Sequence, residues 1–494
     1  MAETGQDAMT RTIMLQGTGS DVGKTILVAG LCRLASNRGL NVVPFKPQNM
    51  SNNAAVSDDG GEIGRAQWLQ ALAARTPSSV HMNPVLLKPQ SETGSQIIVQ
   101  GKVFGQAKGR DYQRLKPQLL GAVMDSFQQV SEGRDLVIVE GAGSPAEINL
   151  RAGDIANMGF ATRAGVPVVL VGDIDRGGVI ASLVGTHTIL PDEDRRQICG
   201  YIINKFRGDV TLFDEGISAI GAFTGWPCLG VIPWLKAAGR LPAEDSVVLE
   251  RLVKGSGGAL KVAVPVLSRI ANFDDLDPLA AEPEVDLVFV RAGDRLPADA
   301  GLVVLPGSKS TIADLEEFRS HGWDRDIAMH VRRGGRVIGI CGGYQMLGRS
   351  VADPLGLEGR PRTVEGLGLL DVETVMAAEK TVRNSKAHSL EHDVPLSGYE
   401  IHLGLTEGPD TIRAPVAIDG RKDGAASADG RVTGTYLHGL FSSDPYRHRL
   451  LSSFGIEGGG RSYRDMVDEA LDDLALELEQ RLSREWLREL LGGR

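Results

Sequence analysis

The chain is poor in cysteine and has no long apolar stretch. Its four cysteines are scattered over 494 residues without the spacing of a metal site or a disulfide framework. We therefore expect a reduced, cytoplasmic setting. No apolar run approaches the roughly 20 residues that a membrane helix requires, and residues 1–11 are polar, without a signal-peptide core. These absences argue against a membrane-spanning or secreted protein.

Basic residues are also fewer than acidic ones. Lysine and arginine total 53 against 63 acidic residues, which gives a net charge of -10 with no long basic run. This balance argues against nucleic acid or an anionic membrane as the main partner. The hydrophobic content of 42% and the 62 glycines fit an α/β protein with many tight turns between strands and helices. The length is large for one core, so two or more domains are expected.

The segment GGRVIGICGGYQMLG, residues 334–348, has the pattern of a nucleophile elbow. A short apolar strand, Arg336 to Ile340, ends at Cys341-Gly342-Gly343 before a helix-like segment. Glycines are needed because a Cβ beside the nucleophile would clash with neighbouring backbone. The helix N-terminus favours the thiolate, so Cys341 is predicted to be a nucleophile. The alternative is a small buried cysteine packed between strand and helix.

A second glycine-rich turn lies near the start of the chain. The strand Thr12 to Gln16 runs into GTGSDVGKT, residues 17–25, and then into a helix. Backbone N–H groups of such a turn wrap a phosphate, while Lys24 neutralises it and the Thr25 hydroxyl coordinates Mg²⁺. Thr18 stands where a common P-loop has its first glycine. This variant resembles dethiobiotin synthetase and its relatives, which activate carboxylates with ATP. The resemblance implies the ATP-binding residues Thr18, Gly19, Asp21, Val22, Gly23, Lys24 and Thr25.

Two acidic residues are further candidate ligands of the Mg²⁺. The apolar strand Asp135 to Gly141 carries Glu140 at its end, where a Walker-B-type carboxylate would hold Mg²⁺ against the phosphates. Such an acid can instead cap the following loop. Glu62 opens a predicted helix from about Glu62 to Ala74 and is the second candidate, with an ordinary helix-cap carboxylate as the alternative.

The first half of the chain alternates between strand and helix patterns. This rhythm predicts right-handed crossovers and a doubly wound parallel sheet in an α/β fold. Polar segments follow several of the strands, at the sheet edge where ligands bind, although each is also consistent with a solvated loop. They are KPQNMSNN (46–53), DIDRGG (173–178) and NKFRGD (204–209), the last two with Arg176, Lys205 and Arg207 as candidate anion-binding residues.

Alternation lapses between about residues 236 and 260 and then resumes in the second half. The strand Leu302 to Leu305 leads into PGSKS, where a backbone N–H near Gly307 would face the same sheet edge as Cys341 and serve an oxyanion. His438 follows a strand-like run and precedes a turn glycine, as a general base for the cysteine should. A lone histidine can also be structural. The tail, residues 463–491, is amphipathic and helical.

Together the second-half motifs resemble a class I glutamine amidotransferase domain, and the P-loop half resembles the ATP-dependent amide synthetases of corrin biosynthesis. The ordered set resembles the cobyric acid synthase family over nearly the whole chain. This resemblance implies an ATP-dependent amide synthetase domain over residues 1–235, a linker over 236–260 and a glutamine amidotransferase domain over 261–494. The motifs are CGGYQ, PGSKST, YLHG, KPQNMSNN, GDIDRGG, NKFRGD and GYEIHLG.

By that resemblance, Cys341 attacks glutamine, His438 shuttles the protons, and the N–H groups of Gly307 and Gly342 stabilise the oxyanion. Most class I glutaminases have a glutamate two residues after the histidine, but Leu440 stands there. What orients the imidazole is left open between Glu400 and an unassisted Cys-His dyad.

The resemblance also implies the substrates. They are ATP with Mg²⁺, glutamine, and a corrinoid, adenosylcobyrinic acid a,c-diamide, amidated at its b, d, e and g carboxylates. The alternatives are the synthetase that forms the a,c-diamide, a P-loop partitioning or scaffold ATPase with a degenerate second domain, and a nucleotide-binding regulator. We expect no nucleic acid or membrane partner. Whether the protein forms a homo-oligomer is left open, because the tail would pack either on its own domain or on a second subunit.

Overall fold

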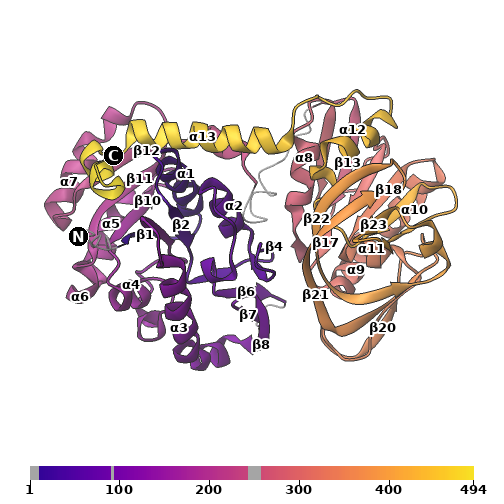
Figure 1. Cartoon of the computed structure of the whole chain (residues 1–494), viewed down its shortest axis with the longest axis horizontal. Coiled ribbons are helices and arrows are strands. Elements are labelled where there is room, and N and C mark those ends of the chain that lie inside the picture. Colours follow the sequence, from indigo (N-terminus) through magenta and orange to yellow (C-terminus); the bar gives the residue numbers. More distant parts are fainter. Residues whose placement is uncertain (1–9, 91–93, 243–256, 494) are drawn as a thin grey trace, which may run out of the picture. The chain divides into compact units, whose positions relative to one another are not determined.

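The computed structural model describes residues 10–90, 94–242 and 257–493. The chain forms two compact units (Figure 1). The first holds the described residues within 1–51, 57–241 and 467–494, and the second those within 52–56 and 242–466. Most of the predicted linker, residues 243–256, lies outside the described residues.

A parallel sheet of six strands forms the centre of the first unit. The strands are nearly continuous apolar runs, as expected where helices cover a parallel sheet. The predicted α/β class and parallel sheet are therefore confirmed. In pairing order the strands are β12 (Cys228–Pro233), β11 (Ile198–Phe206), β10 (Val168–Asp173), β1 (Arg11–Gly17), β9 (Leu136–Glu140) and β2 (Val42–Phe45).

Helices join these strands, and a small second sheet extends the unit. The second sheet and the longest helix, α3, have no counterpart in the prediction from sequence. The helices are α1 (Lys24–Asn37), α2 (Arg65–Ala73), α3 (Gly109–Ser131), α4 (Met158–Ala164), α5 (Val179–Ile189), α6 (Asp192–Arg195) and α7 (Asp214–Thr224). The second sheet has the order β3 (Gln48–Met50), β6 (Val85–Pro89), β7 (Gly94–Val99) and β8 (Lys102–Lys108), and β5 spans Glu62–Gly64. The 3-10 helices are η1 (Val80–Met82), η2 (Ile148–Gly153), η3 (Val210–Phe213) and η4 (Ala237–Arg240).

The C-terminal tail returns to the first unit. It forms α13 (Tyr463–Arg481) and α14 (Arg484–Leu491), and the residues from 467 onward cluster with that unit rather than with the second unit. Gly30 of α1 lets α13 approach closely, because a Cβ there would lie 2.4 Å from the Leu478 side chain. The buried Arg33 pairs with Asp468. The compact units thus differ from the predicted 261–494 domain at the tail.

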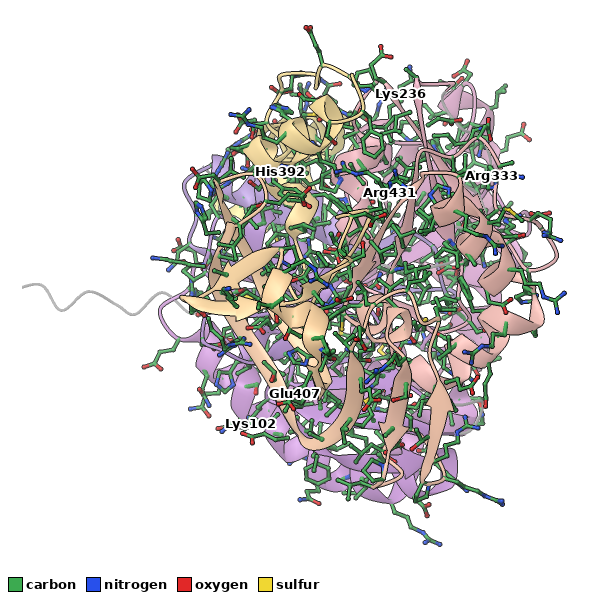
Figure 2. The ribbon with its side chains drawn as sticks, turned by 90° about the vertical axis from the view of Figure 1, so that its right-hand side faces the viewer. Lys102, Lys236, Arg333, His392, Glu407 and Arg431 are labelled. Carbon is green, nitrogen blue, oxygen red and sulfur yellow. The ribbon has the colours of Figure 1, made fainter. Side chains whose placement is uncertain are left out.

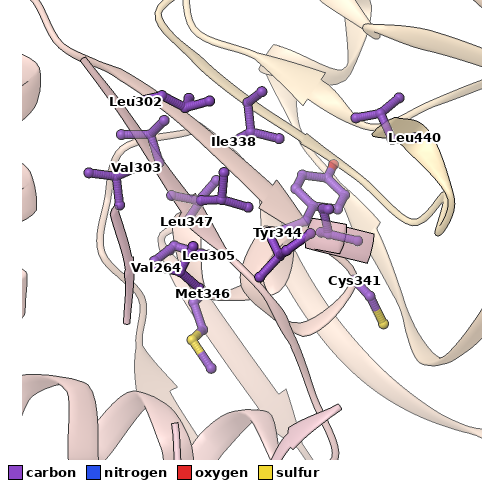
Figure 3. Packing of buried hydrophobic residues seen from close by; sticks show 14 of the residues in the cluster. Val264, Leu302, Val303, Leu305, Ile338, Cys341, Tyr344, Met346, Leu347 and Leu440 are labelled. Carbon is purple, nitrogen blue, oxygen red and sulfur yellow. The ribbon is translucent and has the colours of Figure 1, made fainter. Parts of the chain in front are cut away.

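The second unit is built on another sheet, parallel except at its β25 edge. Strands β15, β16 and β18 begin and end where the sequence predicted. Leu302, Leu305 and Ile338 pack in its core, and the Cys341 sulfur lies beyond the end of the strand (Figure 3). The order is β15 (Val285–Val290), β13 (Leu260–Pro265), β16 (Leu302–Leu305), β18 (Arg336–Ile340), β26 (Val432–Thr435) and β25 (Ala425–Ala426).

A mostly antiparallel sheet and short helices complete this unit. The sheet contains β20 (Arg362–Glu365), β19 (Ser350–Asp353), β21 (Glu373–Ser389), β22 (Val394–Glu407), β23 (Val416–Ile418) and β24 (Arg421–Asp423). The helices are α8 (Asp277–Ala280), α9 (Thr311–Ser320), α10 (Trp323–Arg332), α11 (Gly342–Leu347) and α12 (Asp444–Ser452), with 3-10 turns η6 (Phe273–Leu276), η7 (Pro409–Arg413) and η8 (Leu440–Ser442). The short strands β4 (Ala54–Val56), β14 (Ile270–Ala271) and β17 (Gly307–Ser308) also belong here.

The outer surfaces of both units carry charged side chains. Lys102, Arg333 and Glu407, for example, are exposed and are labelled in Figure 2. Within the described ranges, no helix combines the length and apolar character needed to span a bilayer.

Candidate functional site

The glycine-rich turn after β1 folds tightly around the Lys24 side chain. Gly23 has a φ of 94°, which favours glycine, and a Cβ at Gly17 would lie 2.7 Å from the Gly19 carbonyl oxygen. The Lys24 ammonium lies 3.4 Å from the Gly19 carbonyl oxygen and 3.5 Å from that of Gly143. A lysine that folds over a glycine-rich turn in this way can place its charge beside a phosphate bound at the turn.

The other predicted nucleotide residues are tied to neighbouring strand ends. The Thr18 N–H donates to the Val171 carbonyl at 3.0 Å, which fixes the turn against β10. The Asn204 side chain donates to the Val22 carbonyl at 2.8 Å. Asp21 forms an ion pair with Arg176 at 3.1 Å. Strands β10 and β11 and the loop after β10 therefore meet at the turn.

Glu140 connects the turn to the polar loop after β2. One of its oxygens accepts hydrogen bonds from the Thr25 hydroxyl and from the Lys46 ammonium, both at 2.8 Å. The other accepts from the Gln70 amide at 2.6 Å. Glu140 is 1% exposed. Carboxylate and hydroxyl oxygens side by side at a phosphate-binding turn are hard donors of the kind that Mg²⁺ prefers, so Thr25 and Glu140 fit the ion.

Glu62 lies in strand β5 and not at the start of a helix, because α2 begins only at Arg65. The helix-cap alternative for this residue is therefore wrong. Its carboxylate forms a buried ion pair with Lys88 at 2.5 Å. Among the described residues, no group of three or more His, Cys, Asp or Glu side chains is arranged to hold a metal ion. The Mg²⁺ assignment of Glu62 stays a prediction.

The cations at and after the ends of β10 and β11 are already paired. Lys205 contacts Asp173 at 2.8 Å, and Arg207 pairs with Asp175 at 2.5 Å. The Arg207 guanidinium also lies 4.2 Å from the centre of the Trp234 ring. These pairs hold the loops in place at the edge of the nucleotide turn.

In the second unit, β18 passes into α11 through a strained turn at Cys341. The cysteine has φ 52° and ψ -108°, which side-chain-bearing residues seldom adopt. A Cβ at Gly343 would lie 2.1 Å from the Leu305 carbonyl oxygen, and one at Gly342 would lie 2.8 Å from the Ser308 nitrogen. The two glycines predicted from the elbow pattern are therefore required by close backbone approach.

His438 lies beside Cys341 and is held by an aspartate. Its Nδ1 lies 2.7 Å from Asp275 Oδ2, and the other oxygen of Asp275 accepts a hydrogen bond from the Gly439 N–H at 2.7 Å. Tyr399 stacks on the imidazole with ring centres 5.0 Å apart. Burial alone lowers the pKa of His438, but the charge and hydrogen bond of Asp275, with a hydrogen bond to Cys341, raise the pKa to about 10.

Glu400, the candidate for orienting His438, binds two arginines instead. Its buried carboxylate accepts a hydrogen bond from Arg383 at 2.5 Å and another from Arg421 at 3.1 Å. Although burial raises the pKa of Glu400, its hydrogen bonds and these cations lower the pKa to about 2. Asp275 therefore holds the histidine, and both the Glu400 hypothesis and the unassisted dyad are wrong for this structure.

The loop predicted to supply an oxyanion donor reaches the same place. A Cβ at Gly307 would lie 3.2 Å from the His438 ring carbon Cε1, and the Ser308 nitrogen lies near Gly342. The Ser308 hydroxyl donates to Asp314 at 2.6 Å, and burial raises the pKa of that carboxyl to about 7. The structure thus brings Cys341, His438, Gly307 and Gly342 together.

The loop that carries Asp275 is braced by a residue from the first half of the chain. The Asn272 N–H donates to the Asn53 side chain at 2.8 Å, and the Asn272 side chain accepts from the Ala54 N–H at 3.1 Å. Asn272 has a φ of 53°, so the pair holds a left-handed residue at the start of η6. Asn53, at the end of the KPQNMSNN segment, therefore supports the position of Asp275.

Comparison with known proteins gives a family for both halves. The CobQ/CobB/MinD/ParA nucleotide binding domain matches residues 13–248, and the CobB/CobQ-like glutamine amidotransferase domain matches residues 261–446. A cobyric acid synthase of Sinorhizobium sp is 79% identical over 483 residues, which cover 98% of this chain and 100% of that protein. The cobyric acid synthase of Rhizobium meliloti (strain 1021) is 78% identical over 484 residues, again 98% of this chain and 100% of that protein. The chain belongs to the cobyric acid synthase family.

The predicted family is thereby confirmed, and with it an ATP-dependent ligase of cobalamin biosynthesis that takes its nitrogen from glutamine. Three residues at the sites of this cobyric acid synthase family member were not predicted from the sequence. Lys46 and Gln70 both bind Glu140, and Lys46 stands at the head of a segment that the sequence did place at the ligand edge. The residues around Asp275 do not indicate its role, because it lies in an acidic turn far from His438 in the chain.

Proposed function

We propose that this enzyme amidates the b, d, e and g carboxylates of adenosylcobyrinic acid a,c-diamide to give cobyric acid. Family membership supports the product, because the relatives are named for it. Two separate groups of residues on one chain support the proposed division into a glutamine-hydrolysing site and a phosphoryl-transfer site. One site contains Cys341, His438 and Asp275, and the other contains Lys24, Thr25 and Glu140.

At the first site, the Cys341 thiolate attacks the side-chain amide of glutamine and forms a thioester, with ammonia as the leaving group. His438 supplies the proton that ammonia takes and then removes a proton from the water that hydrolyses the thioester. The Asp275 carboxylate holds Nδ1 and so leaves Nε2 for the reacting atoms. The N–H groups of Gly307 and Gly342 are the proposed donors to the oxyanion.

At the second site, a substrate carboxylate receives the terminal phosphoryl group of ATP, because ammonia cannot displace oxygen from a bare carboxylate. Lys24 and Lys46 stabilise the negative charge of the transferring group. Thr25 and Glu140 are the residues that would hold Mg²⁺, which neutralises charge on the phosphates when bound. Ammonia then replaces phosphate on the activated carboxyl carbon and gives the amide.

The observation that carries this proposal is the buried arrangement of Cys341, His438 and Asp275 in a chain that also builds a phosphate-binding turn. The test is to incubate the protein with Mg·ATP, amide-¹⁵N glutamine and candidate corrinoids, and to count the ¹⁵N atoms gained by mass spectrometry. We expect the a,c-diamide to gain four ¹⁵N atoms, one at each of the b, d, e and g arms, with ATP required. Amidation of cobyrinic acid at its acetate arms alone would contradict the proposal.

A further inference from the structure

Four lysine side chains are buried in the described part of the chain, and all belong to the first unit. Lys24 lies over the glycine-rich turn, Lys46 contacts Glu140 and Lys88 contacts Glu62. The fourth, Lys116 on α3, is 7% exposed and has no such partner. A buried ammonium is unfavourable unless an anion or several acceptors compensate it, so Lys116 needs an explanation.

Lys116 occupies a position where the helix pattern calls for an apolar residue. Leu119 and Val123 follow it on the same face of α3 and are fully buried in the core, while Tyr112 precedes it by one turn. A solvent-facing lysine would lie on the opposite face of the helix. The lysine is therefore held toward the body of the unit by the same face that anchors α3.

The groups around Lys116 do not neutralise it. Among the described residues, its ammonium makes no ion pair within 4.0 Å, and its nearest aromatic partner is the Tyr112 ring, 5.7 Å away. The charge of Asp154 acts on it, but the two oxygens of Asp154 accept hydrogen bonds from the backbone of Ala156, Asn157 and Gly159. Burial lowers the pKa of Lys116 more than Asp154 raises it.

The position of Lys116 relates it to the phosphate-binding edge of the sheet. From Ser131, at the end of α3, Lys116 lies about 22 Å back along the helix. The adjoining strand β9, which ends at Glu140, is only about 17 Å long. Because α3 runs antiparallel to β9, Lys116 lies near the level of the strand end that carries Glu140.

Contacts lead from Lys116 to the same edge. The hydroxyl of Tyr112, whose ring centre lies 5.7 Å from the Lys116 ammonium, donates to the Gln48 side chain at 2.5 Å. Gln48 is two residues beyond Lys46, whose ammonium contacts Glu140. Every residue in this series belongs to the first unit. The unpaired cation is thus linked by one aromatic side chain to the loop that borders the phosphoryl-transfer residues.

We propose that Lys116 binds a carboxylate arm of the acceptor substrate, with the Tyr112 hydroxyl beside it. This proposal rests on the proposed function, in which the acceptor carries several carboxylates. The arm supplies the anion that the protein itself does not provide, and the ammonium positions the acceptor beside the phosphate-binding turn without taking part in bond making. Lys116 is therefore a substrate-positioning residue that the sequence motifs do not contain.

The test compares Lys116→Met, which keeps the apolar stem, with Lys116→Arg and with the exposed control Lys102→Met. We expect Lys116→Met to raise KM for the acceptor about tenfold or more, the usual value of one charged contact. Its KM for ATP and its glutaminase rate should stay within about twofold of the wild type. Lys116→Arg should retain most of the acceptor affinity, and Lys102→Met should match the wild type.

A binding measurement separates this role from a structural one and from phosphate binding. Without ATP, equilibrium dialysis of the corrinoid should give the same loss of affinity for Lys116→Met, and thermal unfolding of the free variant should occur at or above the wild-type temperature. A raised KM for ATP with unchanged acceptor affinity would assign Lys116 to the nucleotide and overturn the proposal. A lowered unfolding temperature with unchanged acceptor affinity would also overturn the proposal. If the wild type binds the corrinoid but forms no amide, the proposed function fails while this test still stands.

Discussion

Replacing Asp275 with asparagine should disable the glutaminase site while leaving its shape almost unchanged. Asparagine keeps an oxygen that can accept from the Gly439 N–H, but it removes the negative charge that lies 2.7 Å from His438 Nδ1. In the wild type, burial lowers the pKa of His438 but Asp275 and Cys341 raise it to about 10. Without the aspartate, burial is opposed only by the hydrogen bond and charge of Cys341, and we expect the pKa of His438 to fall to its ordinary value of 6.5 or below.

The size of the effect follows from the protonated fraction of the histidine. At pH 8 the wild-type imidazole is almost fully protonated, whereas a group with a pKa of 6.5 or less is protonated in about 1 molecule in 30 or fewer. Loss of the fixed ring orientation adds to this factor. We expect a fall of about 10²-fold to 10³-fold in glutamine hydrolysis at pH 8, within the usual range for general acid–base catalysis.

The assay is glutamate release between pH 6 and pH 10, with amide formation from free ammonia as an internal check. The wild-type rate should persist until the pH approaches about 10, and the alkaline limit of Asp275→Asn should move below pH 7. Because the pKa of His438 is raised on folding, its contribution to stability is full below about pH 6.5 and disappears as the pH rises through about 10. The stability difference between wild type and variant should shrink over that interval.

Glu400→Gln provides the comparison, since Glu400 pairs with Arg383 and Arg421 rather than with the histidine. Its glutaminase rate should stay within about fivefold of the wild type and its pH profile should not move. If Asp275→Asn kept the wild-type pH profile while Glu400→Gln shifted it, the assignment of the aspartate would be refuted.

Four further substitutions test other parts of the structure. Lys24→Ala should abolish amide formation while glutaminase activity persists at least in part, and an unchanged amidation rate would exclude the turn as the activating site. Gly343→Ala should destabilise the second unit by about 2–4 kcal/mol in thermal unfolding, because its Cβ would lie 2.1 Å from the Leu305 carbonyl oxygen. Gly121→Ala, which meets no atom within 4 Å on α3, should instead stabilise the first unit by up to about 1 kcal/mol. Asn53→Ala should lower the glutaminase rate about fivefold to tenfold with no change in KM for ATP, since Asn53 braces the Asp275 loop; a wild-type rate would show that the brace is dispensable.

Local pattern was enough to predict the parallel strands and the two turns that carry the sites. Strands such as Val285–Val290 and Arg336–Ile340 are short apolar runs bounded by turn residues, so their limits could be read directly. Gly23 is required by its positive φ and Gly343 by a close backbone contact. Both requirements are visible in the sequence, because glycine stands at these positions. Cys341 and His438 each follow a strand, and parallel strands bring their carboxyl ends together.

Side chains that meet only through tertiary packing could not be predicted in this way. Asp275 reaches His438 from a loop 163 residues earlier in the chain, and nothing around it distinguishes it from Asp274. Glu62 was expected to start a helix, but it lies in strand β5, where its carboxylate pairs with Lys88. The tail has the pattern of an amphipathic helix, and its contacts with Gly30 and Arg33 show which unit it covers.

The central claim is that one chain holds two separate reactive centres, and Cys341→Ala tests it most directly. The variant is supplied with Mg·ATP and the a,c-diamide, and amides are counted by mass with either glutamine or ammonium chloride at alkaline pH as the nitrogen source. The account predicts no amide from glutamine and a near wild-type yield from ammonia. Equal loss with both nitrogen sources would contradict it.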